Sequence, residues 1–210
     1  YAGLVKCLDD NVGRILAALE EHGLAKDTLV VFTNDNGGQT KTGAVNTPLR
    51  GRKGQLLEGG IRVPMAMRWP GVVDAGRTID DPVVSLDFLP TFVALAGAPV
   101  DPAWSLDGTD LLPLLEGEAE SLPERSLFWR KDGEKGEIAM RLGRWKLHVP
   151  GRSEAVRPAL YDLETDVGEA VDRAEAHPER VKRMLAALAG WEKDLESPRW
   201  RYGRARRPAR

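Results

Sequence analysis

Residues 28–38 read TLVVFTNDNGG, and the interpretation of the whole chain starts from them. The first six residues form a short apolar, β-branched run, which is typical of a buried strand. Asp35 and Asn36 follow this run directly and precede two glycines. Because ligands of α/β sheets bind just beyond the carboxyl ends of strands, these two side chains are candidate ligand-binding groups.

A carboxylate next to an amide supplies hard oxygen ligands. Such oxygens suit Ca²⁺ or Mg²⁺ better than Zn²⁺, which prefers His and Cys. The glycines allow a sharp turn, so that the side chains of Asp35 and Asn36 can face one point. Ca²⁺ takes about six to eight oxygens, however, and Asn-Asp-Asn-Gly-Gly by itself is usually a turn. The residues alone therefore leave both a metal site and an ordinary turn open.

Lys53 lies in a second glycine-rich segment, Arg50–Gly54. A lysine ammonium is a compact cationic donor for an oxyanion such as sulfate or phosphate, and the glycines leave room for one. The spacing differs from that of a phosphate-binding loop, which needs Gly-x-x-x-x-Gly-Lys-Ser/Thr. A solvated basic loop is the alternative for Lys53. Arg50 and Arg52 either contact a polyanionic substrate or support the loop.

Further elements are expected on both sides of these segments. Apolar residues at three- and four-residue spacing predict a helix that ends near Gly23. Ile61–Trp69 is typical of a second strand, and Ser85–Ala96 of a helix. This order of elements favours an α/β layer with a largely parallel sheet.

After about residue 120 the pattern changes to short strand-like runs separated by turn residues. Close spacing without helices predicts an antiparallel meander, and a last helix is expected over Pro178–Leu195. The strand runs are Ser126–Arg130, Glu137–Leu142, Trp145–Val149 and Ala159–Leu163, with turns at Asp132-Gly133, Gly143 and Pro150-Gly151. We therefore expect an α/β portion over residues 1–120, a small α+β subdomain with an antiparallel sheet over 121–197, and a basic tail over 198–210.

The composition is ordinary for a globular chain. Of its 210 residues, 42% are apolar and 30% charged, and the formal net charge is −2. The single cysteine, Cys7, excludes an internal disulfide framework, and we interpret it as a small core residue. His22, His148 and His177 neighbour neither glycine-rich segment, which favours structural or surface roles. The tail Arg199–Arg210 either binds polyanions or is a solvated terminus.

Several segments, in this order, resemble the second half of type I sulfatases (arylsulfatases) of the alkaline-phosphatase-like superfamily. They are Tyr1–Asp9, Thr28–Gly38, Pro48–Gly71 and Ser85–Gly97, followed by LDGTDLLPLL, LGRWKLHV and LYDLETDVGE. The most specific of them is LRGRKGQLLEGGIRVP. The resemblance implies the carboxy-terminal part of an alkaline-phosphatase-like sheet-and-helix domain, followed by a small α+β subdomain.

The resemblance also implies a chemistry, the hydrolysis of sulfate esters with Ca²⁺ and a formylglycine nucleophile. By residue match, Asp35 and Asn36 are expected to be two Ca²⁺ ligands, and Lys53 to contact the sulfate group or the bridging oxygen. Cys7 does not match the Cys/Ser-x-Pro-x-Arg motif from which formylglycine forms. The pair Asp9-Asp10 is not the family's acidic ligand pair. The nucleophile, the other metal ligands and the active-site histidines are therefore expected upstream.

The helix pattern is already running at Tyr1, so we expect a piece of a longer protein that is inactive alone. The expected partners are a sulfate-ester substrate, such as a sulfated glycan, and the missing amino-terminal part; neither nucleic acid nor a membrane is expected. The resemblance implies a periplasmic or secreted location. Two alternatives stay open: a phosphonate monoester hydrolase or phosphodiesterase of the same superfamily, and a non-catalytic protein that binds sulfated glycans.

Overall fold

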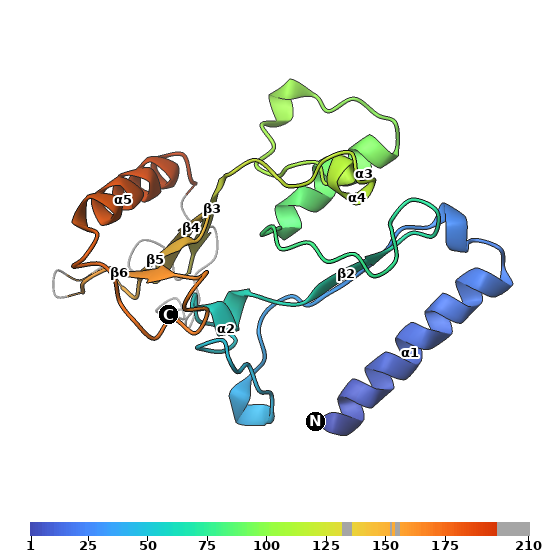
Figure 1. Ribbon diagram of the computed structural model, residues 1–210, viewed down its shortest axis with the longest axis horizontal. Coiled ribbons are helices and arrows are strands. Elements are labelled where there is room, and N and C mark those ends of the chain that lie inside the picture. The colour runs from blue at the N-terminus through green and yellow to red at the C-terminus, as the bar shows by residue number, and fades with distance from the viewer. Residues whose placement is uncertain (132–135, 152, 154–155, 197–210) are drawn as a thin grey trace, which may run out of the picture. The chain divides into compact units, whose positions relative to one another are not determined.

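Two compact units make up the computed structural model, which describes residues 1–131, 136–151, 153 and 156–196 (Figure 1). The first unit contains residues 1–33 and 65–123, and the second contains residues 34–64 and 124–210. The segment with Asp35, Asn36 and Lys53 therefore folds with the carboxy-terminal half of the chain. The domain limits expected at residues 120 and 197 stay a prediction.

An antiparallel strand pair lies in the first unit. β1 (Val30–Thr33) pairs with β2 (Met65–Arg68), with Thr33 opposite Met65. The prediction of a largely parallel sheet is wrong for this pair. Parallel pairing needs a crossover of about a dozen residues or more, usually a helix. Here the chain leaves β1 at Thr33, passes through residues 34–64 and enters β2 at Met65, opposite Thr33. The two strands therefore run in opposite directions.

The first helix, α1 (Ala2–Glu21), keeps much of its apolar face exposed. It ends as predicted, because Gly23 follows with a φ of 69° in the left-handed region that glycine favours. No residue of α1 is buried, and 74% of Leu4 is exposed. Cys7 is exposed as well. Its interpretation as a core residue is therefore wrong for this chain, because the helix stripe has too little to pack against.

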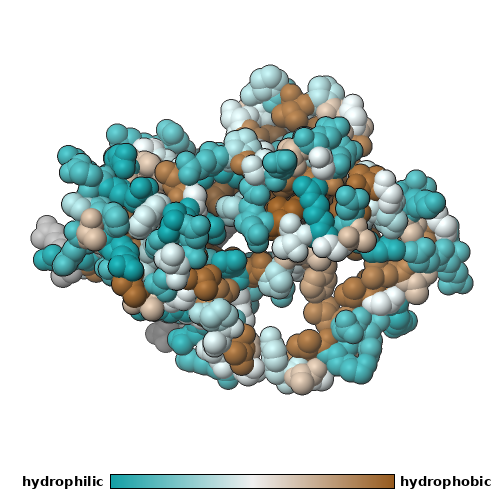
Figure 2. Space-filling view, viewed as in Figure 1, coloured by the Kyte–Doolittle hydropathy of each residue, from teal (hydrophilic) through white to brown (hydrophobic). Residues whose placement is uncertain are grey.

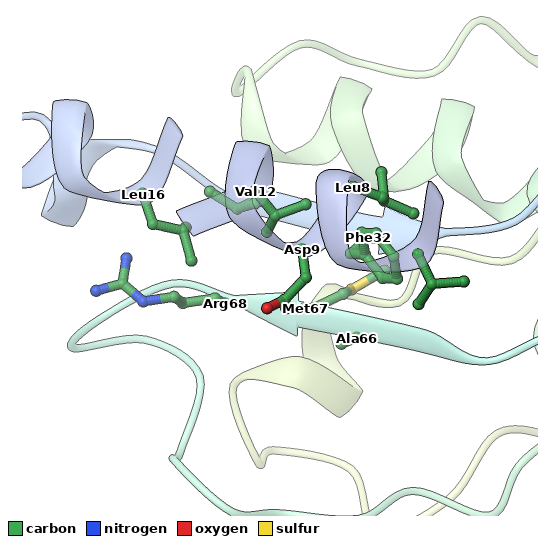
Figure 3. Close-up of a pocket in the computed structure, with 10 residues that line it drawn as sticks. Leu8, Asp9, Val12, Leu16, Phe32, Ala66, Met67 and Arg68 are labelled. Atoms are coloured by element: carbon green, nitrogen blue, oxygen red, sulfur yellow. The ribbon is translucent and has the colours of Figure 1, made fainter. Parts of the chain in front are cut away.

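A pocket with a volume of about 360 Å³ lies between α1 and the strand pair (Figure 3). Its walls are mainly apolar. Leu8, Val12 and Leu16 line it from the helix, and Phe32 and Met67 line it from the two strands. The helix therefore turns an apolar stripe toward the strands without closing against them.

Two more helices belong to the first unit, α3 (Phe88–Leu95) and α4 (Leu112–Leu115). The helix predicted over Ser85–Ala96 is confirmed, although its first turn is a 3₁₀ turn. The buried carboxylate of Asp87 accepts a hydrogen bond from the backbone N–H of Thr109 at 2.8 Å. Asp87 thereby ties the start of α3 to a loop that follows it in the chain.

Several loops contain short helical turns. Three-residue 3₁₀ turns occur at Ala25–Asp27, Thr40–Thr42 and Pro102–Trp104. Across the ranges that the structure describes, no helix has both the length and the apolar character needed to cross a membrane.

The second unit contains a four-stranded antiparallel sheet in the order β3-β4-β5-β6. The strands are β3 (Ser126–Arg130), β4 (Ile138–Leu142), β5 (Trp145–Val149) and β6 (Ala159–Asp162). The predicted meander is confirmed, and Gly143, with a φ of 56°, lies in the turn between β4 and β5. The turn predicted at Asp132-Gly133 and the tail Arg199–Arg210 lie outside the described residues.

Helix α5 (Pro178–Lys193) packs on the sheet and closes its core. The buried side chains of this core are Ile138, Met140, Leu147, Leu160, Met184 and Leu188. The ring of Phe128 stacks on Trp191 with centroids 5.0 Å apart. The helix predicted over Pro178–Leu195 is confirmed to within two residues at its end.

The other face of the sheet receives the segment that carries the candidate site. Successive side chains of a strand point to opposite faces, so Lys146 and Tyr161 point away from the core that contains Leu147 and Leu160. Leu57 packs against Tyr161 on this side. The short helix α2 (Glu58–Ile61) follows Leu57 directly.

Truncation of Leu188 to alanine tests the core. Leu188 is 3% exposed, so Leu188→Ala should lower the free energy of unfolding by about 2–5 kcal/mol through lost apolar contact and a cavity. Leu185 lies on the same helix but is 37% exposed, so Leu185→Ala should cost less than about 1 kcal/mol. Chemical denaturation measures both values. Equal losses would contradict the described packing of α5.

Candidate active site

The turn that follows β1 packs on α2 through glycine backbones. The N–H of Gly37 donates a hydrogen bond to the carbonyl oxygen of Gly60 at 2.9 Å. A Cβ atom on Gly37 would lie 1.9 Å from the carbonyl oxygen of Gly59, and one on Gly60 would lie 2.0 Å from that of Gln55. No side chain fits at these distances. Gly37 therefore lets the turn approach α2, and Gly60 lets α2 approach residues 50–57, where a side chain would not fit.

Asn46 joins the turn to the lysine loop, a name that we use for residues 50–57. Its amide oxygen accepts from the N–H of Gly38 at 3.0 Å. Its amide nitrogen donates to the carbonyl oxygens of Gly38 at 2.9 Å and of Gly51 at 3.0 Å. No sequence pattern singled out Asn46 as a site residue. The only sequence feature that could have indicated this role is an asparagine between two glycine-rich segments. An amide side chain has both a donor and an acceptor, so it can hydrogen-bond to backbone groups of both segments.

The backbone of Lys53 lies beside the same turn. Its N–H donates to the carbonyl oxygen of Gly38 at 3.2 Å, two residues after Asn36. The structure thus brings the backbones of the two predicted segments together. The roles of Asp35, Asn36 and Lys53 stay predictions.

The three predicted side chains are available to a ligand. Asp35 and Lys53 are exposed and Asn36 is half-buried. Within the part of the chain that the structure describes, none of the three side chains forms a hydrogen bond or an ion pair. A carboxylate and an amide oxygen fit a hard cation such as Ca²⁺, and a free ammonium fits an oxyanion.

As candidate metal ligands, Asp35 and Asn36 are too few to fill a coordination shell. Among the described residues, no group of three or more His, Cys, Asp or Glu side chains comes together to hold a metal ion. Ca²⁺ takes about six to eight oxygens. Asp35 and Asn36 therefore fit Ca²⁺ by donor type, and a Ca²⁺ site here would need further oxygens.

A buried ion-pair cluster lies behind the lysine loop. The ammonium of Lys146, with no exposed surface, lies 2.8 Å from Glu58 Oε1 and 2.8 Å from Glu169 Oε1. The N–H of Glu58 donates to Glu169 Oε2 at 2.7 Å. Burial raises the pKa of Glu169, and the neighbouring Lys146 charge opposes this rise. None of these three residues was predicted from sequence, although a lysine inside the apolar strand run WKLHV was a usable signal.

Two further contacts anchor the loop. Arg50 Nη1 donates to the carbonyl oxygen of Glu169 at 2.8 Å, so Arg50 supports the loop in this structure. Glu137 Oε1 accepts from the N–H of Leu56 at 2.9 Å and lies 2.7 Å from His148 Nε2. The side chain of Arg52 stays exposed.

The histidines have the structural or surface positions that the sequence predicted. His148 is 7% exposed and contacts Glu137. His177 precedes α5 and meets the ring of Trp145 edge-on at 4.8 Å. His22 is exposed after α1.

Comparisons with known proteins agree over nearly the whole chain. A family model described as Sulfatase matches residues 1–98, and one described as N-sulphoglucosamine sulphohydrolase, C-terminal, matches residues 52–188. Arylsulfatase A of Homo sapiens is 40% identical in an alignment 187 positions long, which covers 77% of this chain and 36% of that protein.

Two solved structures are also similar. Ps i-CgsB in complex with k-i-k-neocarrahexaose has a TM-score of 0.86 at 34% identity, covering 97% of this chain and 45% of that one. BT4656 in complex with its substrate D-glucosamine-2-N,6-O-disulfate has a TM-score of 0.68 at 25% identity, covering 90% of this chain and 39% of that one. The predicted fold class is confirmed. The chain spans less than half the length of each of these relatives.

Substitution of Gly60 tests the close backbone contact between α2 and the lysine loop. Gly60→Ala should lower the free energy of unfolding by about 1–3 kcal/mol or more, because its Cβ collides with backbone rather than with a movable side chain. Gly190 is a matched control inside α5 with nothing within 4 Å of its Cβ position. Gly190→Ala should stabilise the protein by about 0.5–1 kcal/mol, as in other helix interiors. Thermal and chemical denaturation measure both, and a neutral Gly60→Ala would contradict the described contact.

Proposed function

The chain belongs to the sulfatase family, and we propose that it forms the carboxy-terminal part of an enzyme that hydrolyses sulfate esters. One observation carries this proposal. The Asp35–Asn36 turn and the lysine loop are hydrogen-bonded to each other, yet the three side chains with ligand-binding chemistry stay free. A free carboxylate, amide and ammonium on adjacent backbones suit a cation and an oxyanion bound side by side.

Asp35 and Asn36 would hold Ca²⁺ through a carboxylate and an amide oxygen. When bound, Ca²⁺ would act as a Lewis acid that neutralises charge on the sulfate oxygens. The rigid glycine turn keeps the two ligands at neighbouring positions, which lowers the entropy lost when the ion binds. The remaining ligands and a formylglycine nucleophile would come from a part of the protein outside this chain.

Lys53 would bind the sulfate group or the bridging oxygen of the ester. Its ammonium has no partner among the described residues, so it keeps its full capacity to donate to an oxyanion. Negative charge grows on the bridging oxygen as the sulfur–oxygen bond breaks. A fixed positive donor there stabilises the transition state more than the ground state.

The amino-terminal part of the same protein is the proposed partner of the first unit. Hydrophobic residues gather where α1 and the strand pair run in Figure 2, and the apolar pocket opens among them. β1 and β2 pair only with each other among the described strands, which leaves backbone edges for further strands. Large exposed apolar surfaces mark interaction sites.

We propose a sulfated glycan as the substrate class. The similar structure of BT4656 is a complex with its substrate, a disulfated glucosamine, and that of Ps i-CgsB is a complex with a neocarrahexaose. A periplasmic or secreted location is proposed on family resemblance alone.

Lys53→Ala tests the oxyanion role. In the full-length protein it should lower kcat/KM for an aryl sulfate by about 10²–10³-fold, the usual loss for one transition-state donor. Lys182→Ala, at an exposed lysine of α5, is the matched control and should stay within about twofold of the unchanged protein. Steady-state assays measure kcat/KM for an aryl sulfate and for a phosphodiester, and the better substrate decides between a sulfatase and a phosphodiesterase. An unchanged kcat/KM in Lys53→Ala would refute the role.

Asp35→Asn tests the metal role. The substitution keeps the size of the side chain but removes the charge, so the Ca²⁺ concentration for half-maximal activity should rise roughly tenfold or more. A chelator should abolish activity of the unchanged full-length protein, and added Ca²⁺ should restore it. Asp194→Asn, at the exposed end of α5, should leave the Ca²⁺ requirement as it was. Activity that resists chelation would contradict Ca²⁺ dependence.

The 210-residue chain alone should not turn over sulfate esters. The chain supplies two of the proposed metal ligands, and its one Ser-x-Pro-x-Arg stretch, Ser121–Arg125, lies just before β3 and not upstream of Tyr1, where the resemblance places the nucleophile. Both the nucleophile and most of the cation affinity would therefore be missing. The measurement is an aryl sulfate assay with and without Ca²⁺. Robust turnover by this chain alone would overturn the assignment of the nucleophile to another part of the protein.

A further inference from the structure

The lysine loop is fixed at both of its ends by residues that flank strands of the four-stranded sheet, Glu169 after β6 and Glu137 before β4. At its start, Arg50 donates to the carbonyl oxygen of Glu169 at 2.8 Å. Near its end, the N–H of Leu56 donates to Glu137 at 2.9 Å. Lys53 lies between these anchors, and its own backbone N–H bonds to the turn with the proposed metal ligands.

The strongest anchor is the buried cluster that follows the loop. Glu58 comes five residues after Lys53 and is 2% exposed. Glu169 accepts from the backbone N–H of Glu58 at 2.7 Å, and Lys146 binds the side chains of both carboxylates at 2.8 Å. The three residues therefore form a closed ring of contacts that holds both the backbone and the side chain of Glu58.

The backbone of Glu169 indicates that this ring is tightly held. Its φ is 53°, in the left-handed region that residues other than glycine rarely adopt. Such a conformation persists only where surrounding contacts determine it, and it is frequent near functional sites. Here the contacts are those to Lys146, to Glu58 and, through the carbonyl oxygen, to Arg50.

Lys146 contacts both buried carboxylates directly, at 2.8 Å each. The charge of Arg141 also interacts with that of Glu58. Arg62 also approaches Glu58, at 3.8 Å, but its side chain is half exposed. Without Lys146, two buried negative charges would face each other, and one would have to take a proton or move toward water. Since Glu58 begins a helix of only four residues, movement there would shift the end of the lysine loop.

We propose that Lys146 is a positioning residue for Lys53. It acts through Glu58, by fixing where the lysine loop ends and hence where the Lys53 ammonium meets the sulfate group. This inference rests on the proposed function, because it assigns Lys53 to the oxyanion. A purely structural role for Lys146 predicts the same loss of stability but no dependence on Lys53.

A double-mutant cycle on the full-length protein separates these two roles. Lys146→Met should lower kcat/KM for an aryl sulfate by about tenfold or more, because small misplacements of a catalytic group cost up to about a hundredfold. In a Lys53→Ala background, the same substitution should cost less than about twofold, because the group that it positions is gone. The inhibition constant of inorganic sulfate should show the same pattern.

The outcomes distinguish the positioning role from the proposed function. Equal losses from Lys146→Met in both backgrounds would overturn the positioning role and leave the function of Lys53 standing. No loss from Lys53→Ala alone would refute the proposed function itself, and the positioning role would fall with it. If Lys146→Met does not fold, Glu58→Gln goes through the same cycle, because it removes one charge while keeping a hydrogen-bonding side chain.

Hydrogen exchange gives a readout that does not depend on turnover. In Lys146→Met, the peptide over residues 50–57 should exchange faster, while the peptide over β6 should keep its rate. Lys182→Met, at an exposed lysine, serves as the control and should change neither peptide. Faster exchange in both peptides, or in neither, would contradict a specific effect on the loop.

Discussion

A lysine ammonium with no exposed surface, held between two buried carboxylates, is the interaction on which the candidate site depends. The contacts of Lys146 with Glu58 and Glu169 join a segment early in the chain to a sheet that begins some sixty residues later. They explain why residues 34–64 fold with the carboxy-terminal sheet and not with the strands that flank them. Buried charges are costly to desolvate, and only complete mutual pairing offsets that cost.

Glycine backbones supply the second constraint. Gly37 meets the backbone of Gly59, and Gly59 and Gly60 meet the backbone of the lysine loop, at distances that leave no room for a Cβ atom, so these contacts are made by backbone alone. The side chains on either side of the contact are then free to point elsewhere. Asp35 and Lys53 are exposed, on loops whose backbones are held by hydrogen bonds. A rigid backbone with free polar side chains is a good basis for binding a charged ligand.

Local patterns predicted the elements well, and the arrangement of distant elements poorly. Alternating runs and turn glycines located β3 to β6, because strand pairing through short turns is itself local. The predicted parallel direction was wrong for β1 and β2, because apolar periodicity carries no information on the direction of strand pairing. The interpretation of Cys7 as a core residue was wrong, because the apolar stripe of a helix is buried only where another element packs on it. The pairs of Glu58 with Lys146 and Glu169 are separated by 88 and 111 residues, and no local pattern joins them.

The central claim is that Asp35 and Asn36 bind a divalent cation while Lys53 binds the oxyanion beside it. A crystal structure of the full-length protein with Ca²⁺ and sulfate tests this most directly. The account predicts oxygens of Asp35 and Asn36 at about 2.3–2.6 Å from the ion. It also predicts Lys53 Nζ within about 3.2 Å of a sulfate oxygen. An ion bound by other residues, with Lys53 turned away from the sulfate, would contradict it.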